Sequence, residues 1–567
     1  MKTISNSGSF INFYENDRIY IDKTETIYNL LKTQDKIFIS RPRRFGKSLT
    51  LDTIGTLFEK GVDPYFKDTW IYDKWTEPTY PVLKLSFLTL GTESLESFNN
   101  KLVSQISVFA KYIGVVNYIE SADPDSCLNS LLSELRKQNK QIVILIDEYD
   151  CQLTANINNK ELYEKFRTAL RNIYGCLKDQ AAIKFLAVTG VTRLKDTTIF
   201  SVGSDIKDIS NYSEYSQLIG FTRNEIKNFY IDYLKLAASY ENKVSVDKVT
   251  DTQIEDMLDK LAYNYDGYCF DERGVKKVFS TWSVNSFFQK VIATEDVVFG
   301  DYWYDNGGIP SILANYLKSH ELNAVDYLDK NKVVTVPIEL YSNPTSLLDI
   351  DQNVLMCQTG YLTLRSSLTD GAFGVYLAIP NFEVRKSLAK LLKSKFFDSN
   401  TIMALSMDVK ELFNNGSYDN IIERFNAVLN CITYDNYPVI NESALVNYLN
   451  IYLTAVGIPT TIENHTSKGR ADLSLELKDK RTYRHRPCLP HAPHRLYAEI
   501  RRDRDPGAHR LRDALAHAFS HADAQPHAFP HAQRYPRAFA GIPVFHPGSD
   551  AFSHALSHPV SHAGGRC

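Results

Sequence analysis

The chain has 567 residues, too many for one hydrophobic core, so roughly two to four domains are expected. With 44% hydrophobic and 23% charged residues, the composition is that of an ordinary soluble globular protein. A formal net charge of -3 excludes a general attraction to nucleic acid, so any such contact would need a local basic patch. None of the 8 cysteines has the close spacing of a zinc knuckle or redox pair, which favours reduced thiols inside the cell.

The amino-terminal residues 1–13 are too polar for a signal peptide. No apolar run approaches the ~20 residues that a membrane-spanning helix needs. We therefore expect an intracellular, cytoplasmic protein with no membrane partner.

Residues 1–220 alternate short apolar runs with segments of helical periodicity, the pattern of βαβ units with a parallel sheet. Nearly continuous apolar runs of strand length suit buried parallel strands. The predicted strands are Lys36–Ser40, Pro81–Phe87, Gln141–Ile146 and Ile183–Val188. The predicted helices are Leu49–Glu59, Leu95–Ile113, Leu128–Lys137 and Lys160–Leu177.

From residue 221 the pattern becomes mainly helical, and we predict a helical extension over residues 221–330. Thr222 and Glu225 form a capping box that opens a helix over Glu225–Ala238, and Ile254–Tyr263 is a second helix. Residues 331–480 mix strands and helices and are predicted to form a separate α/β domain. Its expected elements are Lys332–Pro337, Gly374–Ala378, Phe382–Ser394 and Ala444–Val456.

The last segment, residues 481–567, differs sharply in composition from the rest. It holds every histidine apart from His320 and His465, many prolines and alanines, and no lysine or asparagine. A shifted reading frame through repetitive DNA would produce such a change. A genuine His-rich tail, metal-binding or disordered, is the alternative. In either case we expect no packed core there.

A phosphate-binding loop is predicted between the first strand and its following helix. A Walker A site requires a strand, then a turn, then a helix, and here the turn ends in Gly46-Lys47-Ser48. Lys47 would reach the β- and γ-phosphates, and Ser48 would offer its hydroxyl to Mg²⁺. Arg41 stands where the general pattern has its first glycine. The residues expected to contact ATP are Arg43, Arg44, Phe45, Gly46, Lys47, Ser48 and Leu49.

Two further strands end in residues that suit nucleotide chemistry. Asp147 follows a buried strand, where a carboxylate can hold Mg²⁺, and Glu148 could activate the attacking water. After the next strand, Thr189, Thr192 and Arg193 are candidates for sensing the γ-phosphate, and a polar strand-end turn is the equally weighted alternative. The predicted catalytic residues are Glu148, Thr189 and Arg193, and the predicted metal ligands are Ser48 and Asp147. Arg43 and Arg44 could instead supply transition-state charge or bind a partner.

These residues together resemble the AAA-ATPase-like family, whose members often carry a PD-(D/E)xK nuclease-like domain. The resemblance covers roughly residues 8–477. Its motifs are Tyr20–Thr24, Ser40–Leu49, Asp147–Asp150, Thr189–Arg193, Ile199–Ser201, Gly220–Thr222, Tyr265–Tyr268, Gln358–Leu362 and Pro380–Arg385. It implies ATP binding and hydrolysis with Mg²⁺, and it permits a homo-oligomer.

The same resemblance implies an incomplete nuclease-like domain within residues 331–480. Glu442 and Asp472 match the helix glutamate and strand aspartate of such nucleases, and ordinary surface acids are the alternative. The strand over Leu473–Leu477 should be followed by one carrying Glu-x-Lys, but no lysine occurs after Lys480. We therefore predict that nuclease activity is absent.

The fold class predicted is α/β: a P-loop NTPase sheet with a helical extension, an incomplete nuclease-like domain and a disordered tail. The leading functional hypothesis is an ATP-driven switch in which nucleotide binding acts on the helical extension. The alternatives are a non-hydrolysing nucleotide-binding scaffold, an ATPase-coupled Mg²⁺-dependent DNA nuclease, and a protein with a metal-binding tail.

Overall fold

The computed structural model describes most of the chain up to Ile500. Outside the described residues lie 116, 179, 195–204, 306–332 apart from Leu313, Tyr316 and Tyr327, 343, 345, 369–373, 398–404, 407–408, 416–417, 433–441, 467–468, 477–481, 489–494 and 501–567. The predicted motif Ile199–Ser201 falls in these ranges.

A five-stranded parallel sheet forms the centre of the amino-terminal part, as the sequence predicts. Its strands are β1 (Lys36–Ser40), β2 (Val82–Ser86), β3 (Ile142–Asp147), β4 (Ile183–Gly190) and β5 (Lys207–Asp208). Their order is β2-β3-β4-β1-β5. Because β4 lies between β1 and β3, the residues after these three strands meet at one edge of the sheet.

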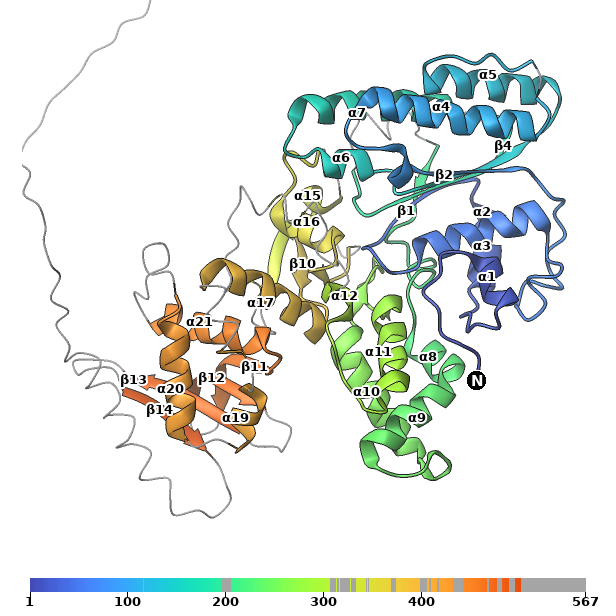
Figure 1. The fold of residues 1–567 in the computed structure, drawn as a ribbon. Helices are drawn as coiled ribbons and strands as arrows, with labels where there is room; N and C mark the ends of the chain where they lie inside the picture. Colours follow the sequence, from blue (N-terminus) through green and yellow to red (C-terminus); the bar gives the residue numbers. More distant parts are fainter. Residues whose placement is uncertain are drawn as a thin grey trace, which may run out of the picture.

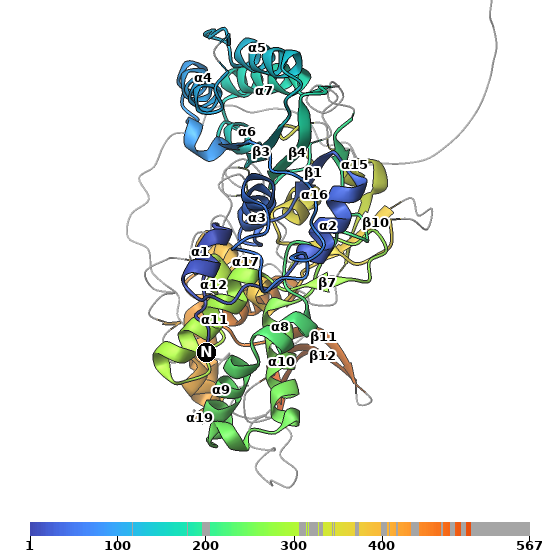
Figure 2. The same cartoon turned by 90° about the vertical axis from the view of Figure 1, so that its right-hand side faces the viewer.

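Helices cover both faces of this sheet (Figures 1 and 2). α4 (Leu95–Tyr112), α5 (Pro124–Lys137) and α7 (Lys160–Cys176) lie on one face. α2 (Thr24–Thr33) and α3 (Lys47–Lys60) lie on the other, with α1 (Phe10–Glu15) against α3. The short η1 (Phe87–Leu90) and α6 (Cys151–Ala155) follow β2 and β3. Strand residues such as Ile144 and Leu186 are fully buried, as expected for a sheet covered on both faces.

A helical segment follows the sheet and has its own hydrophobic core. Its helices are α8 (Arg223–Phe229), α9 (Ile231–Asn242), η2 (Val246–Lys248), α10 (Asp251–Tyr265), α11 (Thr281–Thr294) and α12 (Tyr302–Asp305). The capping box of Thr222 and Glu225 is confirmed, but the single helix predicted over Glu225–Ala238 is two helices that meet at Tyr230. Ile19 and Ile21 join this core, so the amino-terminal segment bridges the sheet and the helical segment.

Short strands from the end of the predicted helical extension and from the first part of the predicted third domain lie beside the central sheet (Figure 1). β6 (Tyr268–Cys269) pairs with β7 (Lys277–Val278), and β8 (Val334–Pro337), β10 (Gly374–Ala378) and β9 (Thr363–Leu364) form a three-stranded antiparallel sheet. α15 (Ile338–Ser342) and α16 (Gln352–Gln358) accompany it. The Leu347 backbone N–H donates to the Tyr163 hydroxyl of α7 at 3.2 Å, which ties this region to the central sheet.

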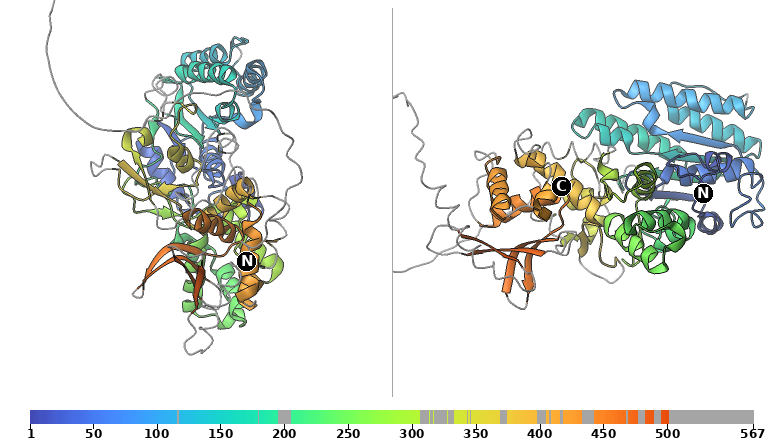
Figure 3. Two further views of the ribbon diagram at one scale, coloured as in Figure 1. Left: turned by 90° about the vertical axis from the view of Figure 1, so that its left-hand side faces the viewer. Right: turned by 60° about the horizontal axis from the view of Figure 1, so that its bottom comes forward.

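The carboxyl-terminal unit packs on α17 (Phe382–Phe396) and lies away from the central sheet, as Figure 3 shows. It contains α19 (Val409–Asn415), α20 (Tyr418–Leu429), α21 (Glu442–Ala455) and a four-stranded antiparallel sheet. The strands are β11 (Thr460–Thr466), β12 (Gly469–Glu476), β13 (Thr482–Cys488) and β14 (Arg495–Ile500), in that order.

Two of these strands, β13 and β14, lie in the segment from residue 481 for which no packed core is expected. β13 pairs with β12 through Glu476 and Thr482, and β14 extends the sheet. Strand addition uses the backbone N–H and C=O groups of the open β12 edge, so it needs little side-chain pattern. The His-rich remainder, residues 501–567, lies outside the described residues.

None of the helices in the described part of the chain is long and apolar enough to cross a membrane.

Candidate functional site

The loop between β1 and α3, which is predicted to bind phosphate, contains two residues with left-handed backbone conformations. Gly46, the residue before α3, has φ 102°, a conformation that favours glycine because it has no Cβ. Arg44 also lies in the left-handed region, with φ 69°. Residues with positive φ curl the loop back on itself, so successive N–H groups can converge on an anion at the start of α3.

Lys47 is buried beneath this loop. Its Nζ donates to the backbone carbonyl oxygens of Arg41 at 2.9 Å and Pro42 at 3.0 Å. Burial lowers the pKa of Lys47, and the nearby charges of Asp147 and Glu148 oppose that shift. The ammonium group therefore rests on carbonyl groups of the loop, beside the position where phosphates would lie.

Asp147, at the end of β3, accepts hydrogen bonds from one hydroxyl group at the start of α3 and from one near the end of β4. Ser48 Oγ donates to Asp147 Oδ2 at 2.5 Å, and Thr189 Oγ1 donates to Asp147 Oδ1. The structure thus brings together both predicted metal ligands and one predicted catalytic residue. A carboxylate with adjacent hydroxyls is an oxygen donor set of the kind that Mg²⁺ prefers.

Glu148 follows Asp147 and has an unusual backbone. Its φ of 55° lies in the left-handed region, which costs a residue with a Cβ about 1–2 kcal/mol. Such strain concentrates at functional sites. Burial raises the pKa of Glu148 above its ordinary value, and the charge of Asp147 adds to this effect. A carboxyl group of raised pKa is a better base than an exposed glutamate.

Asp150, two residues further on, has a different role. Its carboxylate is buried and accepts hydrogen bonds from Thr192 N and Thr192 Oγ1, both at 2.6 Å, and from Val191 N at 3.2 Å. Tyr149 packs against the end of β4, where a Cβ on Gly190 would come within 2.4 Å of the tyrosine ring. Tyr149 and Asp150 therefore fasten the end of β4 beside β3.

A cavity of about 450 Å³ opens on the loop. It lies where the amino-terminal segment, the loop and the helical segment meet. All seven residues predicted to contact ATP line it, together with Glu148. Other lining residues are Ser5–Gly8, Phe13, Ile19–Ile21, Lys23, Ile27, Thr50, Thr53, Leu88, Leu218–Phe221, Tyr230, Thr281, Trp282 and Asn285. Phosphate-binding groups at one end and apolar walls beyond them suit a nucleotide.

Arg41, the departure from the general Walker pattern, is a buried anchor and does not line the cavity. Its Nη1 donates to Ser210 O at 2.7 Å and to Ser40 O at 2.8 Å. Its guanidinium lies 4.2 Å from the centre of the Phe270 ring. Burial lowers the pKa of Arg41 to about 9, so the group is charged at neutral pH. Sequence reasoning identified the departure but not this role.

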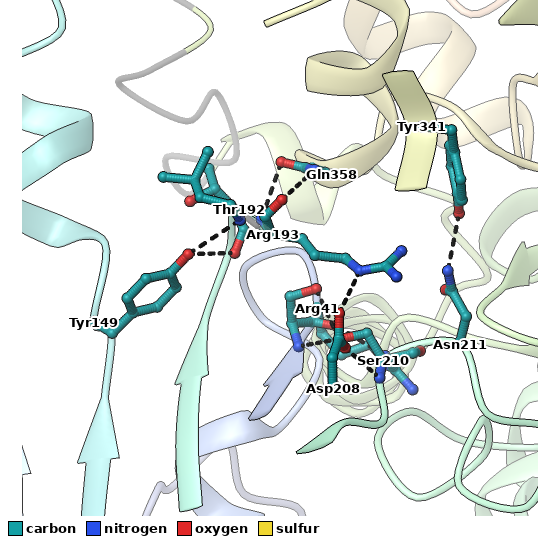
Figure 4. Close-up of polar contacts among 11 residues, drawn as sticks. Arg41, Tyr149, Thr192, Arg193, Asp208, Ser210, Asn211, Tyr341 and Gln358 are labelled. Atoms are coloured by element: carbon teal, nitrogen blue, oxygen red, sulfur yellow. Dashed lines mark hydrogen bonds and ion pairs between the residues drawn. The ribbon is translucent and has the colours of Figure 1, made fainter. Parts of the chain in front are cut away.

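Arg193 belongs to the same polar cluster, which Figure 4 shows at the ends of β4, β1 and β5. Its Nε donates to Asp208 Oδ2 at 2.6 Å, and its backbone N–H donates to Gln358 Oε1 at 3.2 Å. Burial alone would raise the pKa of Asp208, but Arg193 holds it below its ordinary value. Arg193 therefore does not line the cavity and is joined instead to β5 and α16.

Residues of α11, α12 and β6, all distant in sequence, contact the loop. The sequence analysis did not predict these contacts. Thr281 Oγ1 and the Trp282 backbone N–H donate to Arg44 O at 3.1 and 3.4 Å. Trp303 Nε1 donates to Arg43 O at 3.4 Å. Phe45 is buried edge-to-face against Tyr268. Helix α11 could have been predicted from the helical spacing of its apolar residues Val284, Phe287, Phe288 and Val291.

Glu383, at the start of α17, links these supports and should make stability depend on pH. Its carboxyl group contacts Ser283 Oγ at 2.7 Å and Trp303 N at 2.9 Å. Burial raises the pKa of Glu383 to about 8. Since the folded pKa exceeds the unfolded one, the contribution of Glu383 to stability is full below about pH 4.5 and is lost as pH rises through about 8. The slope is at most ~1.4 kcal/mol per pH unit.

Urea unfolding of wild type and Glu383→Gln between pH 5 and pH 9 would measure this effect, and the glutamine should flatten the curve. Parallel curves for the two proteins would contradict the assignment.

The strand order and the loop give the described amino-terminal part of the chain an α/β fold with a five-stranded parallel sheet, consistent with a P-loop NTPase. Residues 6–200 match the family model described as "Predicted AAA-ATPase". Across 474 residues the chain is 26% identical to "Uncharacterized protein in vnfD 5'region" of Azotobacter chroococcum mcd 1, covering 81% of this chain and 84% of that protein. The crystal structure of Cdc6p from Pyrobaculum aerophilum aligns at 12% identity with a TM-score of 0.25, covering 70% of this chain and 100% of that one, and this similarity is too low to carry an argument.

The family model covers residues 6–200 and gives no support to the nuclease-like domain predicted within residues 331–480. Glu442 opens α21, Asp472 lies on β12, and the next strand, β13, reads Thr-Tyr-Arg-His-Arg-Pro-Cys. That strand carries neither glutamate nor lysine, so it lacks the Glu-x-Lys pair that the resemblance implies.

We expect no Mg²⁺-dependent nicking of supercoiled plasmid by the purified protein, measured on agarose gels. Nicking that disappears in Asp472→Ala would contradict this expectation.

Proposed function

We propose that the chain binds ATP with Mg²⁺ in the cavity beside the loop and hydrolyses it, acting as a nucleotide-driven switch. The observation that carries the proposal is the cluster around Asp147. Hydroxyl groups from the loop helix and from β4 converge on this carboxylate, with the Lys47 ammonium behind the same loop.

The donor set fits magnesium. Among the described residues no group of three or more His, Cys, Asp or Glu could hold a metal alone. Mg²⁺ commonly uses one or two protein carboxylates and completes its shell with water and substrate phosphates. Ser48 and Asp147 are the residues that would hold it. When bound, the metal would neutralise charge on the phosphates.

The remaining roles belong to side chains of this chain. Lys47 leaves its carbonyl partners to bind phosphate oxygens, and the N–H groups at the start of α3 bind further oxygens. Glu148 accepts the proton of the attacking water. Thr189 orients Asp147 through its hydrogen bond. Arg193 acts at a distance, because its ion pair with Asp208 fastens β5 and Ser210, on which Arg41 and the loop depend.

The switch would act through the contacts that hold the loop. α11 donates to Arg44 O, and Trp303 donates to Arg43 O. Both elements meet Glu383 of α17, and Arg385 of the same helix donates to Thr460 O at 2.7 Å in the carboxyl-terminal unit. A change in loop conformation thus has a continuous route to the four-stranded sheet.

Calorimetric titration with Mg²⁺ and ATP tests nucleotide binding. Lys47→Ala should weaken ATP affinity at least tenfold, because charge-assisted hydrogen bonds contribute ~1.5–3 kcal/mol. Lys60→Ala, at the exposed end of the same helix, is the matched control and should bind as wild type does. Absence of binding by wild type, or equal binding by Lys47→Ala, would refute the proposal.

A further inference from the structure

An arginine of the loop is stacked on a tryptophan in the wall of the same cavity. The Arg44 guanidinium carbon lies 4.2 Å from the centre of the Trp282 ring. Both residues line the cavity, Arg44 from the loop and Trp282 from the first turn of α11. The contact therefore joins the phosphate-binding loop to the helical segment at the site itself.

The guanidinium of Arg44 is incompletely paired. Its Nη1 is shielded from solvent and has no hydrogen-bond partner. Burial lowers the pKa of Arg44, and the neighbouring charge of Arg43 lowers it further. Nearby lie the cations Arg43 and Lys47. A buried donor without an acceptor is costly, and an anionic oxygen in the cavity would satisfy it.

Trp282, in contrast, is fixed at both ends. Its indole Nε1 donates to Tyr302 O at 3.1 Å, and its backbone N–H donates to Arg44 O at 3.4 Å. The ring is thus a rigid platform that limits the positions open to the long Arg44 side chain. Limiting those positions in advance lowers the entropy lost when the guanidinium binds a ligand.

We infer that Trp282 is a positioning residue of the nucleotide site: its indole holds the Arg44 guanidinium where the phosphates of ATP can bind it. The inference rests on the proposed function, and it names Arg44 as the group that transmits ATP binding to α11. The guanidinium can donate its N–H groups to phosphate oxygens while its face stays on the indole, because the two contacts use different parts of the group. Bound phosphate is thereby linked through Arg44 and Trp282 to α11.

Three variants test the inference. Arg44→Gln should weaken ATP affinity roughly tenfold or more, because the charged donor is lost. Trp282→Leu should weaken it severalfold, while Trp282→Phe, which retains an aromatic face, should bind nearly as wild type does. Affinities would be measured by calorimetry with Mg²⁺ and ATP at one fixed salt concentration.

Tryptophan emission supplies a readout that a merely structural role would not move. The chain has 4 tryptophans, so the signal of Trp282 is the difference between wild type and Trp282→Phe. ATP should change this difference signal. In the Arg44→Gln background, the same difference should not respond to ATP, because no guanidinium joins the phosphates to the ring.

Wild-type affinity in both Arg44→Gln and Trp282→Leu would overturn the inference, as would an emission response that persists without Arg44. If Trp282→Leu does not fold, Trp282→Phe and Arg44→Gln decide the question by themselves. Failure of the proposed function looks different, because wild type would then bind no ATP or Lys47→Ala would bind equally well.

Discussion

Replacing Glu148 by glutamine is expected to abolish ATP turnover while ATP affinity is kept. Glu148 lines the cavity beside the loop, and burial together with Asp147 raises the pKa of its carboxyl group. Glutamine has nearly the same size but cannot accept a proton. Loss of a general base lowers rates by roughly 10²–10⁴-fold. Phosphate release under steady-state conditions and calorimetric titration with ATP would measure the two quantities separately.

The matched control is Glu161→Gln, an exposed acid near the start of α7, which should leave turnover unchanged. Turnover that survives in Glu148→Gln would mean that another group activates the water. If wild type and variant both bind ATP without turnover, the chain is a non-hydrolysing nucleotide-binding scaffold.

The parts of the site that could be predicted from the sequence are those encoded locally. β1 begins and ends as predicted, because its apolar run leads directly into the Gly46-Lys47-Ser48 turn. The end of β3 is equally readable, since Asp147 and Glu148 interrupt a continuous apolar run. Adjacent parallel strands then bring these ends together without further information.

Partners far apart in sequence could not be predicted. Arg41 looks like a loop residue, and only the fold shows that it is buried against Ser210 and Phe270. β5 has just the residues Lys207 and Asp208, too few for any periodicity. In the same way, Arg193 has the residue type of a phosphate sensor, and its ion pair with Asp208 is visible only in the structure.

Asp150 stands two residues from Glu148, and the loss of its carboxylate should affect stability, whereas the loss of the Glu148 carboxylate should affect turnover. Asp150 accepts two backbone N–H groups and one hydroxyl, all from Val191 and Thr192. Asp150→Ala would leave these buried donors without an acceptor. Each unsatisfied buried donor costs ~1–3 kcal/mol, so we expect a loss of about 3 kcal/mol or more in the free energy of unfolding.

Urea unfolding followed by circular dichroism would measure this loss, and Glu148→Gln, the control in the same motif, should lie within ~1 kcal/mol of wild type. A loss below ~1 kcal/mol in Asp150→Ala would show that the end of β4 does not depend on Asp150. The expected contrast follows from where the two carboxylates lie. The Asp150 carboxylate is enclosed by the backbone of the β4 end, while Glu148 has a strained backbone and faces the cavity. Because Asp150 holds the end of β4 in place, it also holds Thr189. The contacts of Asp150 therefore maintain the geometry in which Glu148 can act.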